Sequence, residues 1–288
     1  MAETYGKGAP LSYNSYLRVA DLIELQGVRS DPAHHDELLF ITIHQTYELW
    51  FKQILHELDA ALIFLDADRV WQATRALVRA VEIEKILVNQ IHILETMTPL
   101  GFLGFREELN PASGFQSMQF REIEFVSGLK DERILRAFQD DEFADRRLQT
   151  RFAAPTLHDA FFQLLARRGM DAPLDDDTLP EAERAVRYEA RVRAVTAVLT
   201  HFEQANDLFT LADALIAHDE YVLLWRTHHV AMVERMLGSK PGTGGSEGVG
   251  YLRSTLDKKF FPELWEARTH LTTRTDASLG CPFSYKEA

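Results

Sequence analysis

The apolar residues between positions 36 and 69 recur at helical spacing, and this long stripe constrains the fold more than any other feature of the chain. A spacing of three or four residues places side chains on one face of an α-helix, which has 3.6 residues per turn. Glu48 and Lys52 are four residues apart and are expected to pair. The stretch therefore predicts one long amphipathic helix. Its apolar stripe consists of Phe40, Tyr47, Phe51, Ile54, Leu58, Leu62 and Leu65.

Helical spacing continues through most of the remaining chain. Long helices are predicted over about 71–95 and from 181 towards 237, with Asn206 as the candidate break. Shorter helices are predicted over 123–138, 141–152 and 157–168, and the aspartate-rich segment 171–180 is predicted to be a solvated loop. The sequence shows no alternating strand pattern and no fixed-period repeat. We therefore predict an all-α fold, with residues 1–288 forming a single large helical bundle domain.

Composition excludes several classes of partner. The 44 acidic and 31 basic residues give a formal charge of −13, which repels nucleic acid and anionic membrane surfaces. Cys281 is the only cysteine of the 288 residues, so an internal disulfide and a four-cysteine zinc site are both excluded. The sequence has no signal-like N-terminus and no apolar run of membrane-spanning length. We expect a cytoplasmic protein without nucleic-acid or membrane partners.

Six of the fifteen glycines fall between Gly238 and Gly250, directly after the predicted helix that carries His228 and His229. Such a cluster suits either a flexible linker or a loop whose backbone approaches a ligand closely. The segment matches neither GxxxxGK[ST] nor GxGxxG, so a nucleotide-binding loop is not supported.

Two histidines lie on apolar faces of predicted helices. His44 is within the stripe of Phe40 and Tyr47, and His229 is spaced with Trp225 and Met232 on the more inward face of its helix. A lone inward histidine is usually a core residue that hydrogen-bonds to a backbone carbonyl. The sequence has no HExxH, His-x₃-His, Glu-x-x-His or Cys-x-x-Cys-His motif, but non-covalent haem needs only one axial imidazole, so a haem site remains open. Gly-x-Ser-x-Gly is also absent, although a hydrolase triad needs no local signature.

Arg106 lies among aromatic residues, next to Phe102 and Phe105. A guanidinium beside apolar rings suits a ligand that combines a carboxylate with an apolar group, because guanidinium binds carboxylate through two hydrogen bonds. The alternative is a helix-capping or surface arginine. Near the N-terminus, Tyr13 and Tyr16 precede the first long helix and carry little information alone.

Together these segments resemble the tryptophan 2,3-dioxygenase family, and the resemblance extends over nearly the whole chain. Order and spacing both agree. The matching strings are Tyr13-Asn-Ser-Tyr16-Leu-Arg, Pro32-Ala-His-His-Asp-Glu, Phe40-Ile-Thr-Ile-His44-Gln-Thr-Tyr-Glu-Leu-Trp50, Gly104-Phe-Arg106, Ser113-Gly-Phe-Gln-Ser, Leu224-Trp-Arg-Thr-His-His229 and Gly242-Thr-Gly-Gly-Ser-Glu-Gly-Val-Gly250.

The resemblance implies a haem enzyme that uses O₂ to open the indole ring of L-tryptophan. It implies that His229 is the axial ligand of haem b, ferrous in the active form, with Ser113 and Gly114 near the cofactor. It makes His44 the catalytic residue that faces the indole N–H, and Arg106 the partner of the substrate carboxylate. Further substrate contacts are implied for Phe40, Ile41, Thr42, Ile43, Phe102 and Thr243, and for Tyr13 and Tyr16.

The family resemblance also implies a homotetramer in which the N-terminal segment, residues 1–30, reaches a neighbouring subunit's pocket. Thr243 lies within the glycine cluster, which is then expected to close over the amino-acid end of the substrate. Some family members carry tyrosine at the position of Phe102, so a hydroxyl contact available to them is missing here.

Three other functions remain open at the level of sequence. One is a haem dioxygenase of another indole amine, which tryptamine turnover would separate from a tryptophan enzyme. Another is an amino-acid or haem sensor without turnover. The last is a helical oligomerisation scaffold without a cofactor.

Overall fold

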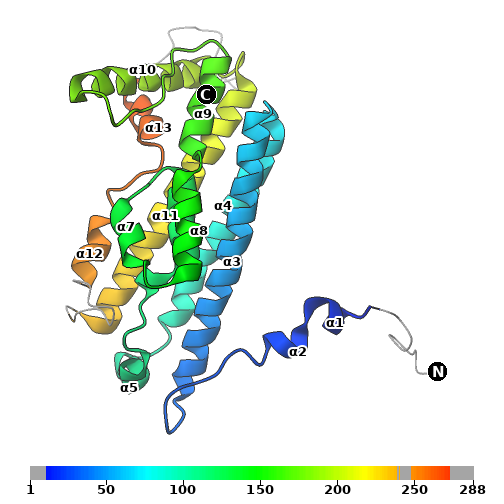
Figure 1. Ribbon diagram of the computed structural model, residues 1–288, viewed down its shortest axis with the longest axis vertical. Coiled ribbons are helices and arrows are strands. Elements are labelled where there is room, and N and C mark those ends of the chain that lie inside the picture. Colours follow the sequence, from blue (N-terminus) through cyan, green and yellow to red (C-terminus); the bar gives the residue numbers. More distant parts are fainter. Residues whose placement is uncertain (1–10, 239, 241–247, 273–288) are drawn as a thin grey trace, which may run out of the picture.

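The computed structural model describes residues 11–238, 240 and 248–272, and in these ranges every regular element is a helix. Three long helices lie side by side along the molecule, namely α3 (His35–Asp66), α4 (Val70–Leu94) and α11 (Asn206–Leu237) (Figure 1). α4 packs against both α3 and α11 along its length. The all-α prediction is confirmed.

The long helices begin and end where the sequence supplies caps. The Nδ1 atom of His34 accepts the backbone N–H of Asp36 at 3.2 Å and starts α3. α3 ends before Asp68, whose φ is 55°, and α11 ends at Gly238, whose φ is 60°. The predicted break near Asn206 is also confirmed, because α10 (Glu181–Thr200) stops before α11 begins.

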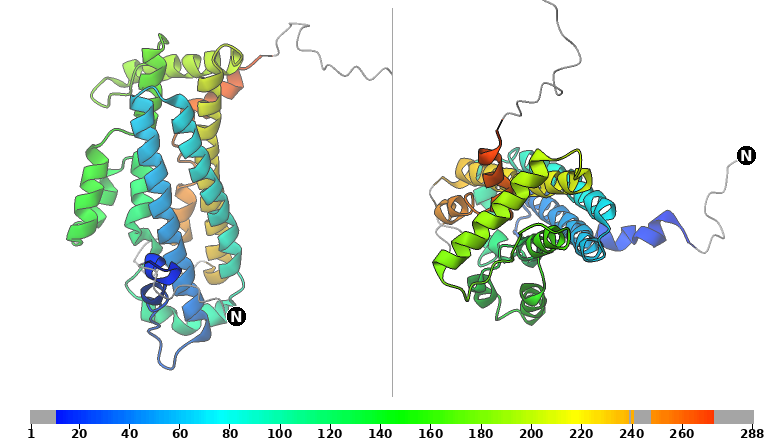
Figure 2. Two further views of the ribbon diagram at one scale, coloured as in Figure 1. Left: turned by 90° about the vertical axis from the view of Figure 1, so that its right-hand side faces the viewer. Right: turned by 90° about the horizontal axis from the view of Figure 1, so that it is seen from above.

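Shorter helices cover the bundle. α6 (Met118–Ser127) and α9 (Leu157–Arg167) pack against α3, α8 (Glu142–Ala153) packs against α6, and α7 (Glu132–Ala137) lies beside α8 (Figure 1). α10 crosses one end of the bundle with α13 (Pro262–Glu266) beneath it (Figure 2). The remaining helices are α1 (Tyr13–Leu17), α2 (Val19–Leu22), α5 (Pro99–Arg106), α12 (Val249–Ser254) and the 3₁₀ turns η1 (Glu107–Leu109), η2 (Gly114–Gln116) and η3 (Ala267–His270).

Two local predictions are wrong. A single helix over 123–138 is replaced by α6 and α7, because Gly128 adopts φ 130° between them and its missing Cβ leaves room for His158. Glu48 does not use Lys52 as its partner. Its carboxylate instead accepts hydrogen bonds from Ser117 at 2.6 Å and Gln119 at 2.8 Å, which ties α3 to the start of α6.

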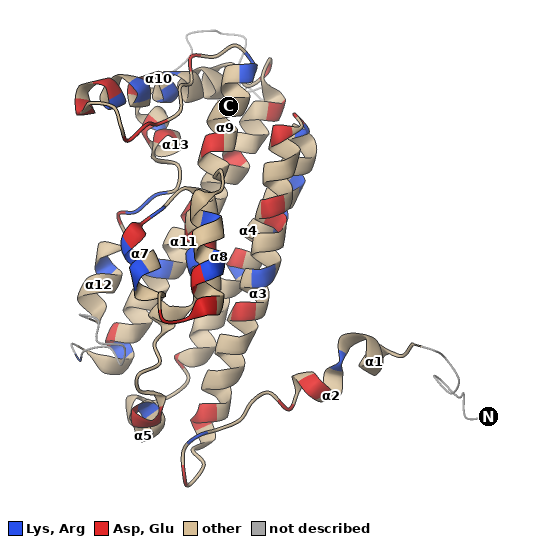
Figure 3. Ribbon diagram, in the orientation of Figure 1, with Lys and Arg blue, Asp and Glu red and all other residues tan. Residues whose placement is uncertain are grey.

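One large apolar cluster fills the space between α3, α4, α9, α10, α11 and α13, and a smaller one lies under α7 and α8. The organisation of residues 1–288 as one domain stays a prediction. Basic and acidic residues alternate on α8 and α10, so neither helix presents a uniformly basic face (Figure 3). Within the described ranges, no helix combines the length and apolar character that crossing a bilayer requires.

Candidate functional site

An aromatic cluster forms where α5 packs between α3 and α11. The rings of Phe40 on α3 and Phe102 on α5 stack at 5.6 Å, and the ring of Phe105 meets Phe40 edge-on at 5.6 Å and Phe102 edge-on at 5.4 Å. Such offset and edge-on pairs are favourable aromatic geometries. α5 begins at Thr98, whose hydroxyl accepts the backbone N–H of Gly101 at 2.9 Å. The two predicted wall residues, Phe40 and Phe102, are therefore brought together.

His44 lies one turn beyond Phe40, and their ring centroids are 4.1 Å apart. Its Nδ1 is 2.7 Å from the carbonyl oxygen of Phe40. A carbonyl oxygen can only accept, so Nδ1 carries the proton and donates it to this bond. Nε2 is thereby left as a lone-pair acceptor. The hydrogen bond to the Phe40 carbonyl thus assigns the Nδ1-protonated tautomer of His44.

The expectation that the His44 ring is buried in the apolar stripe is wrong, because the residue is exposed to solvent. At this end of α3 the stripe meets the short helix α5, whose Phe102 and Phe105 rings contact Phe40. Burial nevertheless lowers the pKa of His44, against the opposing effects of the Phe40 carbonyl and the Glu48 carboxylate. His44 is therefore a neutral side chain that water can reach.

The ring of His229 on α11 stacks on Trp225 at 5.1 Å, with an interplanar angle of 14°. Burial, together with the charge of a protonated His44, lowers the pKa of His229 to about 4, so the two imidazoles interact electrostatically. No hydrogen bond to the His229 ring occurs among the described residues. Its neighbour His228 is equally half-buried but turns towards His92, at 5.5 Å.

Two interacting neutral imidazoles, one on α3 and one on α11, thus lie beside aromatic rings. The described part of the chain holds no group of three or more His, Cys, Asp or Glu side chains that could bind a metal ion. A metal that takes one protein ligand and its remaining ligands from a macrocycle fits this donor set, whereas a tetrahedral zinc site does not.

Other predicted site residues lie in α5 and in the 3₁₀ turn η2. Arg106 is the last residue of α5 and is half-buried. Ser113 caps η2 by accepting the N–H of Phe115 at 3.3 Å, and Gly114 follows it in an exposed position. Thr243 lies outside the described residues.

The three residues between Phe40 and His44 point in different directions. Ile41 is half-buried, and the exposed Thr42 donates its hydroxyl to the carbonyl of Leu38 at 2.8 Å. The Ile43 side chain is 5% exposed and packs in the core. Its predicted part in substrate binding is therefore confined to the backbone.

Tyr13 and Tyr16 belong to an arm, residues 11–30, that projects from the body of the molecule (Figures 1 and 2). These tyrosines are 76% and 71% exposed, so they are not packed against the site residues of their own chain. Gln45 on α3 holds the base of the arm through the Gln26 side chain, at 2.5 Å, and the Leu25 carbonyl, at 3.0 Å.

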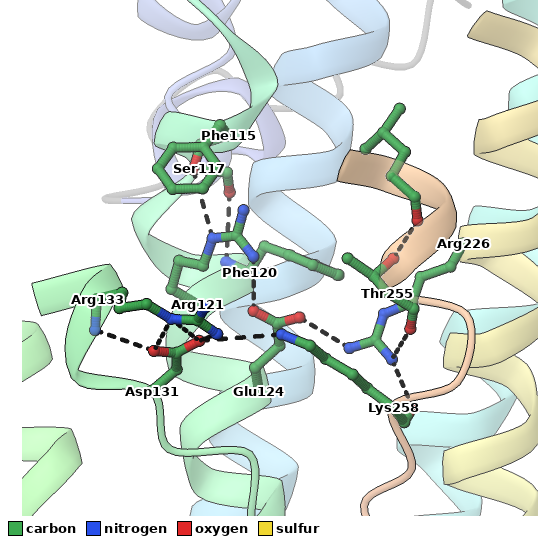
Figure 4. Close-up of polar contacts among 11 residues, drawn as sticks. Phe115, Ser117, Phe120, Arg121, Glu124, Asp131, Arg133, Arg226, Thr255 and Lys258 are labelled. Atoms are coloured by element: carbon green, nitrogen blue, oxygen red, sulfur yellow. Dashed lines mark hydrogen bonds and ion pairs between the residues drawn. The ribbon is translucent and has the colours of Figure 1, made fainter. Parts of the chain in front are cut away.

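A buried ion cluster joins α6 to α11 next to the site. The Glu124 carboxylate lies between two guanidinium groups, those of Arg121 at 2.7 Å and Arg226 at 2.8 Å (Figure 4). Arg226 also donates to the carbonyls of Thr255, at 3.4 Å, and Lys258, at 3.0 Å. The segment that follows the glycine cluster is thereby fixed to the helix that carries His229. Breaking such a buried pair is expected to cost about 3–5 kcal/mol.

Arg121 extends this cluster to the loop before α6. Its guanidinium lies over the Phe115 ring at 4.6 Å and donates to the Phe115 carbonyl at 3.4 Å. Phe115 in turn meets the ring of Tyr251 on α12 at 5.6 Å. The cluster therefore positions η2, which carries Gly114.

Sequence reasoning missed the polar residues behind the site. Glu84 lies on the buried face of α4 with Ala80, Leu87 and Ile91. A carboxylate on an apolar helix face is rarely buried without a partner, so the sequence pattern could have indicated a buried polar contact here. Its partner is His218 on α11, at 2.6 Å. Periodicity within one helix cannot identify a partner on another.

Comparison with known proteins gives consistent matches over nearly the whole chain. The family described as Tryptophan 2,3-dioxygenase matches residues 2–174 and 139–271. A protein of Nocardioides sp. named tryptophan 2,3-dioxygenase is 49% identical over 270 residues, which cover 92% of this chain and 96% of the relative. Proteins with the same name from Herpetosiphon aurantiacus and Myxococcus xanthus are 45% and 39% identical. They cover 91% of this chain each, and 98% and 90% of their own lengths.

Proposed function

The chain belongs to the tryptophan 2,3-dioxygenase family, and on this premise we propose that it inserts O₂ across the indole C2–C3 bond of L-tryptophan to give N-formyl-L-kynurenine. Both oxygen atoms enter the product, so no other reductant is consumed. The observation that carries the proposal is the pair of electrostatically interacting neutral imidazoles, His44 beside the ring of Phe40 and His229 beside the ring of Trp225.

The family implies a haem cofactor and O₂ as a substrate. We assign haem b to His229, because that ring is neutral, stacked and without a hydrogen-bond partner among the described residues, which leaves a nitrogen for an iron ion. Ser113 and Gly114 are proposed to lie beside it. When bound, ferrous haem supplies the iron that activates O₂.

His44 is proposed to orient the substrate. Its Nδ1 is engaged with the Phe40 carbonyl, so Nε2 is the atom that can accept the indole N–H. The lowered pKa keeps that acceptor unprotonated at neutral pH. The contribution of His44 is therefore a fixed hydrogen bond that holds the indole in one orientation.

The other pocket residues match the two ends of tryptophan. The rings of Phe40 and Phe102 suit an indole plane, and Arg106 at the end of the same helix as Phe102 suits the carboxylate. Thr243 is proposed to meet the amino-acid end of the substrate. Ile41 and Thr42 are proposed to line the pocket beside Phe40, together with the backbone of Ile43.

A homotetramer is part of the same proposal. The arm exposes Leu11, Tyr13, Tyr16, Ile23 and Leu25, each more than 60% exposed, although apolar side chains of this size usually become covered. A neighbouring subunit whose substrate site receives the arm would cover them and would give Tyr13 and Tyr16 contact with substrate. A cytoplasmic location stays a prediction from composition.

The direct test is turnover of L-tryptophan by the haem-loaded, reduced protein in air, followed by the absorbance of N-formylkynurenine. Product formation with one equivalent of O₂ consumed is the expected result. A stable Soret band that responds to tryptophan without product would instead indicate a sensor, and absence of any Soret band after hemin addition would indicate a scaffold.

A further inference from the structure

The side chain of Glu48 joins the helix that carries His44 to the start of α6. Ser117 donates its hydroxyl to Glu48 Oε1 at 2.6 Å. The side-chain amide of Gln119 donates to Glu48 Oε2 at 2.8 Å and to the backbone carbonyl of Glu48 at 2.8 Å. These bonds connect one residue of α3 with two residues that lie 69 and 71 positions further along the chain. Two segments that are far apart in the sequence are thereby fixed to each other.

Ser117 is the residue at which the chain turns from η2 into α6. Its backbone N–H donates to the carbonyl of Gly114 at 3.2 Å and closes η2. Its hydroxyl oxygen accepts the backbone N–H of Phe120 at 3.3 Å and caps α6. A hydroxyl can accept and donate at once, so the same group also donates to Glu48. The Glu48 carboxylate therefore holds the junction, and with it η2, against α3.

The Glu48 junction is connected to both histidines of the candidate site. On α3, Glu48 follows His44 by about one helical turn. Burial lowers the pKa of His44 and the Glu48 carboxylate opposes this, so the carboxylate acts on the imidazole. On α6, the ring of Phe120 meets that of Trp225 at 4.8 Å, and Trp225 stacks on His229 at 5.1 Å. A displacement of the first turn of α6 relative to α3 would therefore reach the surroundings of both imidazoles.

α6 has a separate polar anchor on α11, the buried ion pair between Glu124 and Arg226 at 2.8 Å. The Glu48 contacts add an anchor on α3, and hydrogen bonds to an ionised carboxylate are stronger than those between neutral groups. Loss of the Glu48 side chain leaves the attachment of α6 to α11 in place. We therefore expect the fold to persist in its absence, with η2 and the first turn of α6 less firmly held relative to His44.

We propose that Glu48 is a positioning residue for the dioxygenase reaction, because its hydrogen bonds to Ser117 and Gln119 hold η2 and the first turn of α6 in a fixed place relative to His44. Glu48 acts through these segments and has no contact with the reacting atoms. A misplacement of about 1 Å can reduce a rate by about 100-fold, even when its cause lies away from the chemistry. This inference rests on the proposed function, in which His44 orients the substrate and η2 lies beside the cofactor.

Two substitutions at Glu48 separate its hydrogen bonds from its charge. Glu48→Ala removes both. Glu48→Gln removes the charge but keeps an amide that can accept from Gln119 and donate to the Ser117 hydroxyl. Gln119→Ala removes one contact from the side of α6. Glu57→Ala is the matched control, because Glu57 is a buried carboxylate on the same helix that pairs with Arg79 at 3.0 Å, outside the proposed site.

The measurements are tryptophan turnover per bound haem and backbone amide hydrogen exchange of the holoenzyme. Glu48→Ala should lower kcat by about 10–100-fold with little change in KM, and should accelerate exchange in residues 113–120. Glu48→Gln and Glu57→Ala should keep the wild-type kcat and the wild-type exchange in that segment. Gln119→Ala should lower kcat in the same direction as Glu48→Ala, and the double variant should be no slower than Glu48→Ala.

Wild-type kcat in Glu48→Ala overturns the positioning role. So does an equal loss in Glu48→Gln, because the charge would then be the property that matters, or an equal loss in Glu57→Ala, because general destabilisation would then explain it. If Glu48→Ala does not fold, unchanged kcat and exchange in Gln119→Ala overturn the inference. Failure of the proposed function is distinct, since the wild-type protein itself would then form no N-formylkynurenine.

Discussion

At Gly104, the structure predicts that one added methyl group changes the stability of the protein in opposite directions, depending on whether the His34 ring is present. A Cβ at this position of α5 would lie 2.8 Å from His34 Nε2 and 2.9 Å from its Cδ2, well inside the 3.4–4 Å of ordinary contact. The His34 ring cannot move freely, because Nδ1 caps α3 through Asp36 and the ring packs on Phe105 at 5.4 Å. Overpacking of this kind costs about 1–3 kcal/mol.

Alanine also has an intrinsic advantage over glycine of about 1 kcal/mol inside a helix. In the wild-type background, Gly104→Ala should therefore lower the free energy of unfolding by about 0–2 kcal/mol. In the His34→Ala background the ring is gone, and the same substitution should stabilise by about 1 kcal/mol. The expected coupling between the two sites is about 1–3 kcal/mol.

Denaturant unfolding of the four proteins measures this coupling, with Gly27→Ala as a control at a glycine whose Cβ would meet nothing within 4 Å. Because α5 also carries Phe102 and Arg106, Gly104→Ala should raise the KM for tryptophan while haem content is retained. If Gly104→Ala changes the free energy of unfolding by the same amount with and without the His34 ring, the steric argument is refuted.

Three further predictions concern the candidate site and the residues behind it. His44→Ala should keep its Soret band and lose most of its turnover, and full activity would exclude His44 as the residue that orients the indole. Arg106→Leu should raise the KM for tryptophan by about 10–100-fold, as expected for loss of a charge-assisted bond of about 1.5–3 kcal/mol, while wild-type protein should use tryptamine poorly; equal turnover of both amines would contradict a carboxylate contact. The pKa of His218 is raised by folding, so its stabilising contribution is complete below the unfolded value of about 6.5 and is lost as pH rises through the folded value. Denaturation midpoints should therefore fall with rising pH more in the wild type than in His218→Gln, and parallel profiles would show that the Glu84 pair has no such role.

Much of the fold follows from local patterns. The stripe from Phe40 to Leu65 predicts α3 because a face buried against other helices must repeat every three or four residues. The break at Gly128 escaped this reasoning, since Ile123, Phe125 and Ile134 continue an apolar pattern on both sides of it. A glycine in a helical pattern is often tolerated, and here tertiary packing against His158 decides the outcome.

Local sequence patterns also predict only part of the candidate site. The spacing of Trp225 and His229 on one face was evident from the sequence, and the structure confirms that their rings stack. The exposure of His44 was not evident, because a stripe does not reveal how far the other helices cover it. The pairing of Glu84 with His218, 134 residues apart, depends on the register between α4 and α11, which no local pattern encodes.

The central claim is that His229 alone holds the haem iron, and the haem spectrum of His229→Ala tests it most directly. The account predicts that this variant, reconstituted with hemin and reduced, loses the wild-type Soret band and the iron–histidine stretching band, and that added imidazole partly restores them. An unchanged spectrum and native haem retention in His229→Ala would contradict the assignment.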